Sequence, residues 1–199
     1  RIGVGLLGLG TVGSGVANII QNPEGRHPLI AALHLVRVAV RDPNRARGTY
    51  IAKELLTQDP QSVVDDPEVD VVVEVMGGIE PARSLIMRAI AAGKSVVTAN
   101  KSVIARHGDE IAQAANKAGV YVLIEAAVGG GIPIIEPLKQ SLGANKIRKV
   151  SGIINGTTNY ILSRMSKEGV RYDEVLKEAQ ELGYAEADPA ADVEGLDAA

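Results

Sequence analysis

The stretch GLGTVG, residues 8–13, decides how this chain folds. It comes directly after the apolar run Ile2–Leu7, and Val16, Ile19 and Ile20 then recur at helical spacing. A glycine-rich turn that joins a buried strand to a helix is typical of a dinucleotide-binding βαβ unit. The sequence therefore predicts such a unit at the start of the chain.

Each glycine of this turn has its own expected purpose. Gly8 permits the tight turn, Gly10 lets the backbone approach a pyrophosphate, and Gly13 permits close packing of helix on strand. The helix N-terminus then offers N–H groups and a positive dipole to phosphate groups. A structural turn without a ligand is the alternative, which the alternation of strands and helices downstream makes the weaker interpretation.

Apolar β-rich runs alternate with helical patterns as far as residue 124. Further strands are expected at Leu33–Val40, Val69–Val75, Ser95–Thr98 and Val120–Ile124. Helices are expected at Pro81–Ala92 and Ser102–Ala118, each followed by a glycine. Strands this apolar are buried on both faces, which predicts an α/β fold, a Rossmann-like parallel sheet with helices on both faces.

The character of the sequence changes near Glu125. Three consecutive glycines precede Pro133, where a helical stretch begins. The later elements are expected to be a strand at Ile147–Ile154 and helices at Thr158–Glu168 and Tyr172–Leu182, followed by an irregular acidic remainder. We predict a dinucleotide-binding domain at residues 1–124 and the start of an α+β substrate and dimerisation domain at residues 125–199.

Composition narrows the class of protein. The chain has 199 residues, 46% of them hydrophobic, which is enough to bury a core over one or two domains. The absence of cysteine excludes disulfides and thiolate metal sites and fits a reducing, cytoplasmic location. No apolar run approaches the roughly 20 residues that cross a bilayer. A net charge of −3 without Phe or Trp argues against nucleic acid as the main partner.

The end of the second expected strand bears on the kind of dinucleotide. An acidic residue here would bind the ribose hydroxyls of NAD, whereas an arginine suits the 2′-phosphate of NADP. Arg41 comes first, and Asp42 is followed by Pro43, which turns the chain away. Arg45 and Arg47 add positive charge nearby. The sequence therefore favours NADP over NAD, with a solvated loop arginine as the alternative.

Lys101 follows the expected strand that ends at Thr98. Ligands of open α/β sheets bind beyond the carboxyl ends of strands. An ammonium group there can stabilise the alkoxide that develops during hydride transfer, or donate a proton to it. A surface charge is the alternative, although the helix dipole disfavours a cation at a helix start. Lys101 is therefore a candidate catalytic residue.

The whole chain resembles homoserine dehydrogenase. The matching segments are residues 8–13, TANK at 98–101, EAAVGGGIP at 125–133, GIINGTTNYIL at 152–162 and AQELGYAEADP at 179–189, of which the last two are the most specific. Members of this family interconvert L-aspartate 4-semialdehyde and L-homoserine with NAD(P)H, on the route to threonine and methionine. The resemblance implies that activity, and an enzyme that is a homodimer or a higher homo-oligomer.

The resemblance also implies roles for single residues. The positions that match cofactor contacts are Gly8, Gly10, Thr11, Val12, Gly13, Arg41, Thr98, Lys101 and Gly183. Lys101 also matches a catalytic lysine that faces the substrate. Glu186 matches the carboxylate that binds the substrate amino group, and Asp192 and Asp197 complete an acidic pocket. An α-ammonium group needs opposed carboxylates when it is desolvated, and a solvated acidic loop is the alternative.

Residues 125–132 resemble the family's monovalent cation site. The implied ligands are the carboxylate of Glu125 and the backbone carbonyls of Val128, Gly130 and Ile132. Oxygen ligands suit a hard cation such as sodium, and the glycines let the backbone turn tightly enough to present them. A glycine hinge between domains is the alternative, and the two interpretations are compatible.

Both ends of the chain predict a longer protein. The first residue is Arg1, an apolar strand pattern begins at once, and the chain stops at Ala199 in a polar, Asp-rich stretch. The family's second, proton-donating lysine is expected four residues after the position of Asp197, and therefore two positions beyond Ala199. We expect this chain to be inactive by itself.

Other classes of protein fit the sequence less well. A sugar or inositol dehydrogenase usually carries Glu-Lys-Pro where this chain has Asn100, Lys101 and Ser102. Aspartate-semialdehyde dehydrogenase needs a cysteine nucleophile, which the chain lacks. A non-catalytic NADP-binding module would leave the acidic pocket segment without a purpose.

Overall fold

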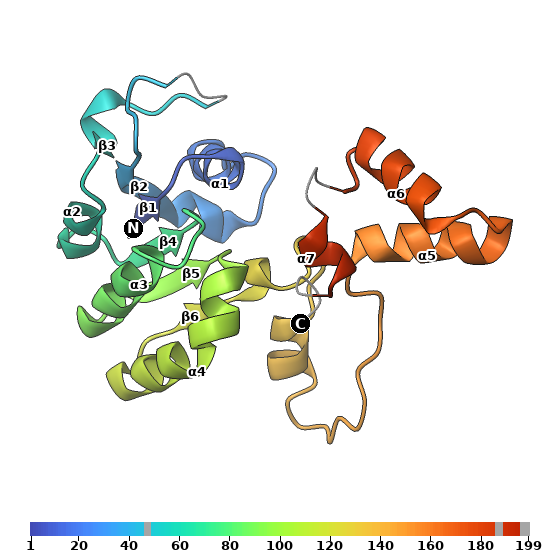
Figure 1. Cartoon of the computed structure of the whole chain (residues 1–199). Coiled ribbons are helices and arrows are strands. Elements are labelled where there is room, and N and C mark those ends of the chain that lie inside the picture. The colour runs from blue at the N-terminus through green and yellow to red at the C-terminus, as the bar shows by residue number, and fades with distance from the viewer. Residues whose placement is uncertain (46–48, 186–188, 196–199) are drawn as a thin grey trace. The chain divides into compact units, whose positions relative to one another are not determined.

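The chain forms two compact units, Arg1–Gly143 and Ala144–Ala199 (Figure 1). The structure is a computed structural model and describes residues 1–45, 49–185 and 189–195. Each unit has hydrophobic core residues of its own. Among the described residues, no helix combines the length and the apolar character that crossing a membrane requires.

Within its described residues, the first unit is built on six parallel strands in the order β3-β2-β1-β4-β5-β6. The strands are β1 (Ile2–Leu7), β2 (Leu33–Ala39), β3 (Leu56–Thr57), β4 (Val71–Glu74), β5 (Ser95–Thr98) and β6 (Val122–Leu123). The α-helices are α1 (Thr11–Gln21), α2 (Pro60–Asp65), α3 (Ala82–Ala91) and α4 (Lys101–Ala118). The short helical turns are η1 (Pro28–Ala32), η2 (Lys53–Leu55), η3 (Glu125–Ala127) and η4 (Pro137–Ser141). This architecture confirms the predicted Rossmann-like sheet.

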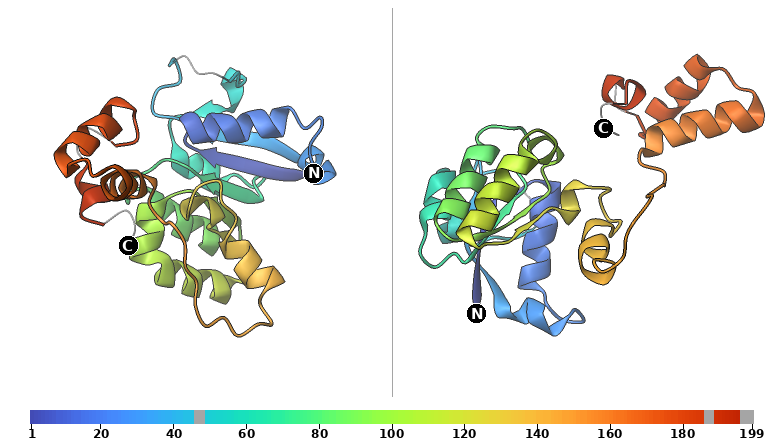
Figure 2. Two further views of the ribbon diagram at one scale, coloured as in Figure 1. Left: turned by 90° about the vertical axis from the view of Figure 1, so that its right-hand side faces the viewer. Right: turned by 90° about the horizontal axis from the view of Figure 1, so that it is seen from below.

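The helices cover both faces of this sheet, as Figure 2 shows. Because successive strand residues point to opposite faces, neighbours in β1 belong to different cores. Leu7 lies in one core with residues of α2, α3 and α4, and Leu6 lies in the other with residues of α1. The strands are therefore apolar on both sides, as parallel strands between two helix layers are.

The register brings the carboxyl ends of four strands to one edge of the sheet. Leu7 of β1 lies beside Ala39 of β2 and beside Glu74 of β4, and Glu74 lies beside Thr98 of β5. The strand order reverses at β1, between β2 and β4. In open α/β sheets, ligands bind beyond the carboxyl ends of the strands at such a reversal. The glycine turn and Lys101 both follow strands that end at this edge.

The second unit contains a pair of helices around a small core. Its described elements are α5 (Gly156–Glu168), α6 (Tyr172–Glu181) and the short α7 (Ala190–Val193). Ile161, Val175 and Ala179 are buried where α5 and α6 pack together. Arg164 of α5 pairs with Glu178 of α6 at 2.7 Å and lowers the pKa of that carboxyl group. The helix pair is thus joined by apolar and ionic contacts.

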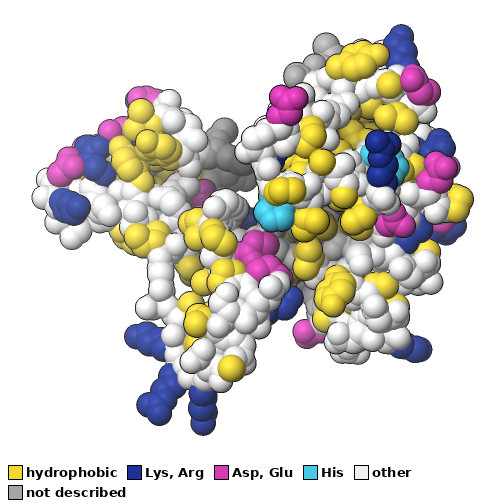
Figure 3. Space-filling view, turned by 180° about the vertical axis from the view of Figure 1, so that it is seen from behind, with side chains coloured by type: hydrophobic (Ala, Val, Ile, Leu, Met, Phe, Trp, Pro, Cys, Tyr) yellow, Lys and Arg dark blue, Asp and Glu magenta, His cyan; other side chains and the backbone are white. Residues whose placement is uncertain are grey.

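The predicted strand at Ile147–Ile154 is wrong. Residues 146–155 have no regular secondary structure, and Ile153 and Ile154 are 72% and 73% exposed. The run has the apolar, β-branched composition of a strand, but a strand needs hydrogen-bonding partners, and the described part of this unit contains no other strand. Figure 3 shows that apolar side chains reach the surface of both units.

The division after Gly143 lies C-terminal to the domain boundary predicted near Glu125. Residues 125–143 belong to the first unit, where η3 packs against β5 and Ala127 is buried. The helical stretch predicted from Pro133 is shorter than expected and comprises residues 135–141. The assignment of functional domains to residues 1–124 and 125–199 stays a prediction.

Candidate functional site

Two glycines of the turn between β1 and α1 are required by close backbone contacts. Gly8 has a φ of +103°, and a Cβ atom on it would lie 2.8 Å from the carbonyl oxygen of Val75. A Cβ atom on Gly13 would collide with the carbonyl oxygen of Gly8. The N–H of Gly8 donates to the carbonyl of Ala39 at 3.0 Å. These contacts pin the turn to the ends of β2 and β4.

Gly10 differs from the other two glycines because the space beside it is open. Apart from its two chain neighbours, none of the described residues places a heavy atom within 4 Å of the position of a Cβ atom on Gly10. Gly10 is the N-cap of α1 and has no side chain to accept a hydrogen bond from the first turn. The N–H groups of Thr11, Val12 and Gly13 precede the first helical hydrogen bond, from Ser14 to Gly10. Open space before free N–H groups fits a pyrophosphate.

The loop after β2 presents two exposed charged side chains, those of Arg41 and Asp42. Arg41 is exposed, and its carbonyl accepts a hydrogen bond from Gln58 at 2.9 Å. The carboxylate of Asp42 accepts the N–H of Asn44 at 2.9 Å, which directs it to its own loop. Arg45 is described, and Arg47 lies outside the described residues. The loop therefore exposes both Arg41 and Arg45, and recognition of the cofactor by Arg41 stays a prediction.

Lys101 is the exposed first residue of α4. Asn100 caps that helix, because its side-chain oxygen accepts the N–H of Val103 at 3.2 Å. The hydroxyl of Thr98 accepts the N–H of Asn100 at 3.0 Å. Thr98 is fully buried, so its side chain organises this corner, and its predicted contact with a cofactor stays a prediction.

Glu74 at the end of β4 is a site residue that the sequence analysis missed. It is 0% exposed, and its carboxylate accepts hydrogen bonds from the N–H of Met76 (2.8 Å) and the hydroxyl of Thr98 (2.7 Å). A single acidic residue in the run VVVEV is the signal that could have revealed it. Such a residue at the carboxyl end of a buried strand lies where ligands bind in these sheets.

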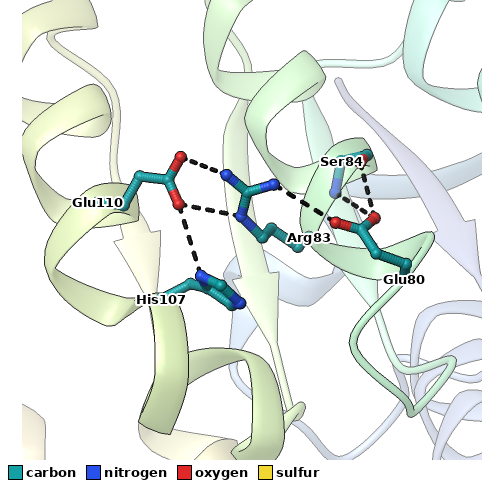
Figure 4. A network of polar contacts seen from close by, with 5 residues as sticks. All are labelled: Glu80, Arg83, Ser84, His107 and Glu110. Atoms are coloured by element: carbon teal, nitrogen blue, oxygen red, sulfur yellow. Dashed lines mark hydrogen bonds and ion pairs between the residues drawn. The ribbon is translucent and has the colours of Figure 1, made fainter.

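A surface network joins α3 to α4 (Figure 4). Arg83 of α3 makes two hydrogen bonds to the carboxylate of Glu110 on α4, and this pairing lowers the pKa of Glu110. His107 lies 3.6 Å from the same carboxylate. Glu80 accepts hydrogen bonds from the N–H and the hydroxyl of Ser84 at the start of α3. The pairing of Arg83 with Glu110 therefore joins α3 to α4, whereas the contacts of Glu80 with Ser84 stay at the start of α3.

A cavity of about 530 Å³ lies within the second unit. Its lining residues are Asn155, Gly156, Thr157, Tyr160, Gly183, Tyr184 and Asp192. The side-chain amide of Asn155 donates to the carboxylate of Asp192 at 2.8 Å. The same cavity is therefore lined by Gly183, a predicted cofactor contact, and by Asp192, a predicted substrate contact. Glu186 and Asp197 lie outside the described residues.

The carboxylate of Glu125 organises the segment expected to bind a cation. It accepts the N–H groups of Ile134, Ile135 (3.1 Å) and Glu136 (2.6 Å). The hydrogen bond from Glu136, followed by that from Ile134, lowers the pKa of Glu125 below its ordinary value. Gly129 and Gly131 adopt φ angles of +57° and +83° in the turn between Glu125 and Ile134. Among the described residues, no cluster of three or more His, Cys, Asp or Glu side chains forms a metal site.

The sheet order, the open glycine turn and the lysine after β5 define a class of protein. The strand order is that of a doubly wound Rossmann sheet, and its first helix has an N-terminus open to a phosphate. The first unit is therefore a dinucleotide-binding unit.

Two family models match this chain. Residues 8–125 match the homoserine dehydrogenase NAD binding domain, and residues 133–199 match homoserine dehydrogenase. The chain belongs to the homoserine dehydrogenase family.

Individual relatives agree with this assignment. The chain is 63% identical over 196 residues to the homoserine dehydrogenase of Synechocystis sp., covering 98% of this chain and 45% of that protein. It is 50% identical over 200 residues to that of Bacillus subtilis, covering 100% and 46%. The chain thus spans slightly less than half the length of these curated relatives.

Solved structures of homoserine dehydrogenases have the same fold. The enzyme of Thiobacillus denitrificans matches with a TM-score of 0.84 and 55% identity, covering 99% of this chain and 46% of that one. A hyperthermophilic archaeal homoserine dehydrogenase in complex with NADPH matches with a TM-score of 0.79 and 29% identity, covering 99% and 66%.

Proposed function

We propose that the protein containing this chain is a homoserine dehydrogenase that interconverts L-aspartate 4-semialdehyde and L-homoserine with NADP(H), in threonine and methionine biosynthesis. One observation supports this most. The open glycine turn and Lys101 follow strands that end at the same edge of the sheet, in a chain 63% identical to a relative of that name.

The residues divide the work as follows in this proposal. The N–H groups of the turn at residues 11–13 bind the pyrophosphate. Bound nicotinamide supplies or accepts the hydride. The ammonium group of Lys101 stabilises the negative charge that develops on the aldehyde oxygen, and it acts with the second, proton-donating lysine of the intact protein to protonate that oxygen. Asp192, with Glu186 and Asp197, binds the ammonium group of the substrate.

The decisive test is an assay of NADPH consumption by the intact protein with L-aspartate 4-semialdehyde. We expect NADPH to be consumed with this aldehyde, and we expect no reduction of NADP⁺ when inositol or a sugar is supplied as the alcohol substrate. Turnover of inositol and none of the semialdehyde would contradict the proposal and favour a sugar or inositol dehydrogenase. Tight NADPH binding without turnover of either would favour a binding module.

Arg41 is proposed to select NADP, which predicts the behaviour of Arg41→Ser. A charge-assisted hydrogen bond to the 2′-phosphate contributes about 1.5–3 kcal/mol, so the KM for NADPH is expected to rise roughly 10- to 100-fold. The KM for NADH should stay unchanged, since NADH lacks that phosphate. Arg26→Ser is the matched control, because Arg26 lies beyond the C-terminal end of α1. Equal KM values for NADPH in the variant and the wild type would assign Arg41 to the solvated surface.

The segment at residues 125–132 is proposed to bind a monovalent cation, with sodium the best candidate. The ionised carboxylate of Glu125 and the carbonyls of Val128, Gly130 and Ile132 are the proposed ligands, and this all-oxygen donor set fits a hard cation. Hydrogen bonds from three N–H groups hold the carboxylate in place beside the glycine turn.

Glu125→Gln is expected to abolish any stimulation of turnover by sodium at constant ionic strength. The pKa of Glu125 is lowered in the folded chain, so the contribution of its ionised carboxylate to cation binding is complete above the ordinary pKa range of glutamate. It is lost only as the pH falls through the lowered value. Turnover is measured with sodium chloride against choline chloride, and Glu136→Gln is the neighbouring control. Equal sodium stimulation in wild type and Glu125→Gln would contradict the site.

We also propose that the intact protein is a cytoplasmic homo-oligomer, on the basis of its family. Light scattering on the purified intact protein measures the number of subunits. A monomer at working concentration would contradict the proposal.

A further inference from the structure

We infer that Glu74 is a positioning residue, whose buried carboxylate aligns the loop after β4 with the start of α4 and thereby places Lys101. This inference rests on the proposed function, in which Lys101 acts on the substrate oxygen. Glu74 does not itself reach the surface, since it is 0% exposed, so it acts through its neighbours.

Three elements donate hydrogen bonds to this one carboxylate. The N–H of Met76 comes from the loop after β4 (2.8 Å), and the hydroxyl of Thr98 comes from the end of β5 (2.7 Å). The side-chain amide of Asn100, at the N-cap of α4, donates at 3.4 Å. An ionised carboxylate is costly to bury unless such donors compensate it. The burial of this carboxylate is therefore compensated only while the three donating elements keep their relative positions.

Asn100 transmits this order to Lys101. Its side-chain amide also donates to the carbonyl of Gly78 at 2.7 Å, and its side-chain oxygen accepts the N–H of Val103. One side chain thus joins the loop after β4 to the first turn of α4. Since Lys101 follows Asn100 directly, a shift of this amide moves the backbone from which the ammonium group extends.

The chemistry of the donors explains why a carboxylate stands here. Met76 and Asn100 donate hydrogen bonds to Oε1 of Glu74 and Thr98 donates one to Oε2, so both oxygens of the carboxylate act as acceptors. Glu74→Gln keeps the shape but places an amide N–H₂ group where a donor already points. The hydroxyl of Thr98 would then lose its acceptor, and the alignment of β5 with α4 would loosen.

The test is a double-mutant cycle in the intact protein. Glu74→Gln is expected to lower kcat by on the order of 10- to 100-fold, because small misplacements of a catalytic group have effects of that size. The Kd for NADPH, measured by fluorescence, should change less than about three-fold. In a Lys101→Ala background, Glu74→Gln should cause no further loss of kcat. Glu80→Gln, in the same loop but 51% exposed, is the matched control and should leave kcat unchanged.

A second readout does not depend on turnover. Amide hydrogen exchange is expected to quicken in Glu74→Gln both at residues 75–80 and at residues 100–104, and in Glu80→Gln only near the start of α3. Unchanged exchange, an unchanged kcat, or an equal loss of kcat in both backgrounds would overturn the inference. If Glu74→Gln does not fold, Thr98→Val keeps the side-chain shape and removes both the donor to Glu74 and the acceptor of the Asn100 N–H, and the same cycle and exchange criteria apply to it. Absence of turnover in the wild type, with the exchange changes present, would refute the proposed function and not the alignment.

Discussion

Lys101→Ala is expected to lower kcat of the intact protein by about 10²- to 10⁴-fold, the range that a positioned acid or base contributes. Lys101 is the first residue of α4 and follows the end of β5. The helix dipole disfavours a cation at this position, whereas a negatively charged ligand atom nearby would be stabilised by one. The loss should appear in kcat, because the charge on the substrate oxygen develops only as the hydride is transferred. Steady-state kinetics with L-aspartate 4-semialdehyde and NADPH measure it.

Two further variants separate charge from geometry. Lys101→Arg keeps the positive charge but replaces a compact ammonium group with a planar guanidinium group, so only partial activity is expected. Lys117→Ala removes an exposed lysine from the last turn of the same helix and should leave kcat unchanged. Wild-type turnover by Lys101→Ala would assign Lys101 to the surface. A raised Kd for NADPH with normal kcat would restrict it to cofactor binding.

The parallel sheet could be predicted because its strands are buried on both faces. Two strands have the predicted bounds, Ile2–Leu7 and Ser95–Thr98. Each is an apolar run between glycines or polar turns, so the sequence shows where the strand begins and ends. The strand predicted at Val69–Val75 is shorter, at Val71–Glu74. The two-residue strand β3 was missed, because its pairing with β2 depends on the folded neighbour and not on its own pattern.

Helix α2 shows that a local signal was present and was not used. Asp59 accepts the N–H of Gln61 at 2.9 Å as the N-cap, and Pro60 occupies the first turn. Both are ordinary features of a helix start. The failed strand at Ile147–Ile154 is the opposite case, because its composition favoured a strand and the described residues of its unit contain no strand to pair with it. Pairing is a property of the whole fold, which a local pattern does not contain.

The site could be predicted at positions that only one type of residue can occupy. Gly8 and Gly13 are fixed by backbone contacts, as their spacing indicated. Glu74 was missed because its partners, Thr98 and Asn100, lie more than twenty positions away and meet it only through the pairing of β4 with β5. In the second unit, Gly183 and Asp192 came from the family resemblance, and the cavity that contains both came from the structure.

Gly10→Val is expected to weaken NADPH binding by on the order of 100-fold while leaving the fold intact. The backbone of Gly10 has a φ of −82° and a ψ of −156°, which other residues adopt. Within the described part of the chain, no atom other than those of its chain neighbours lies within 4 Å of its Cβ position. The new side chain would fill the space that a pyrophosphate needs to reach the N–H groups of the first turn. Forced overpacking costs about 1–3 kcal/mol, and the upper end corresponds to this loss of affinity.

Two other glycines of the same segment provide controls with different outcomes. Gly15 lies in α1 with open space around it, so Gly15→Ala should leave NADPH affinity unchanged and stabilise the chain by up to about 1 kcal/mol. Gly13→Ala should lower the melting temperature even without a ligand, because its methyl group would collide with the carbonyl of Gly8. Fluorescence titration with NADPH and thermal unfolding of the free protein distinguish the three variants. Wild-type NADPH affinity in Gly10→Val would show that the pyrophosphate does not lie at this turn, whatever the other two glycines do.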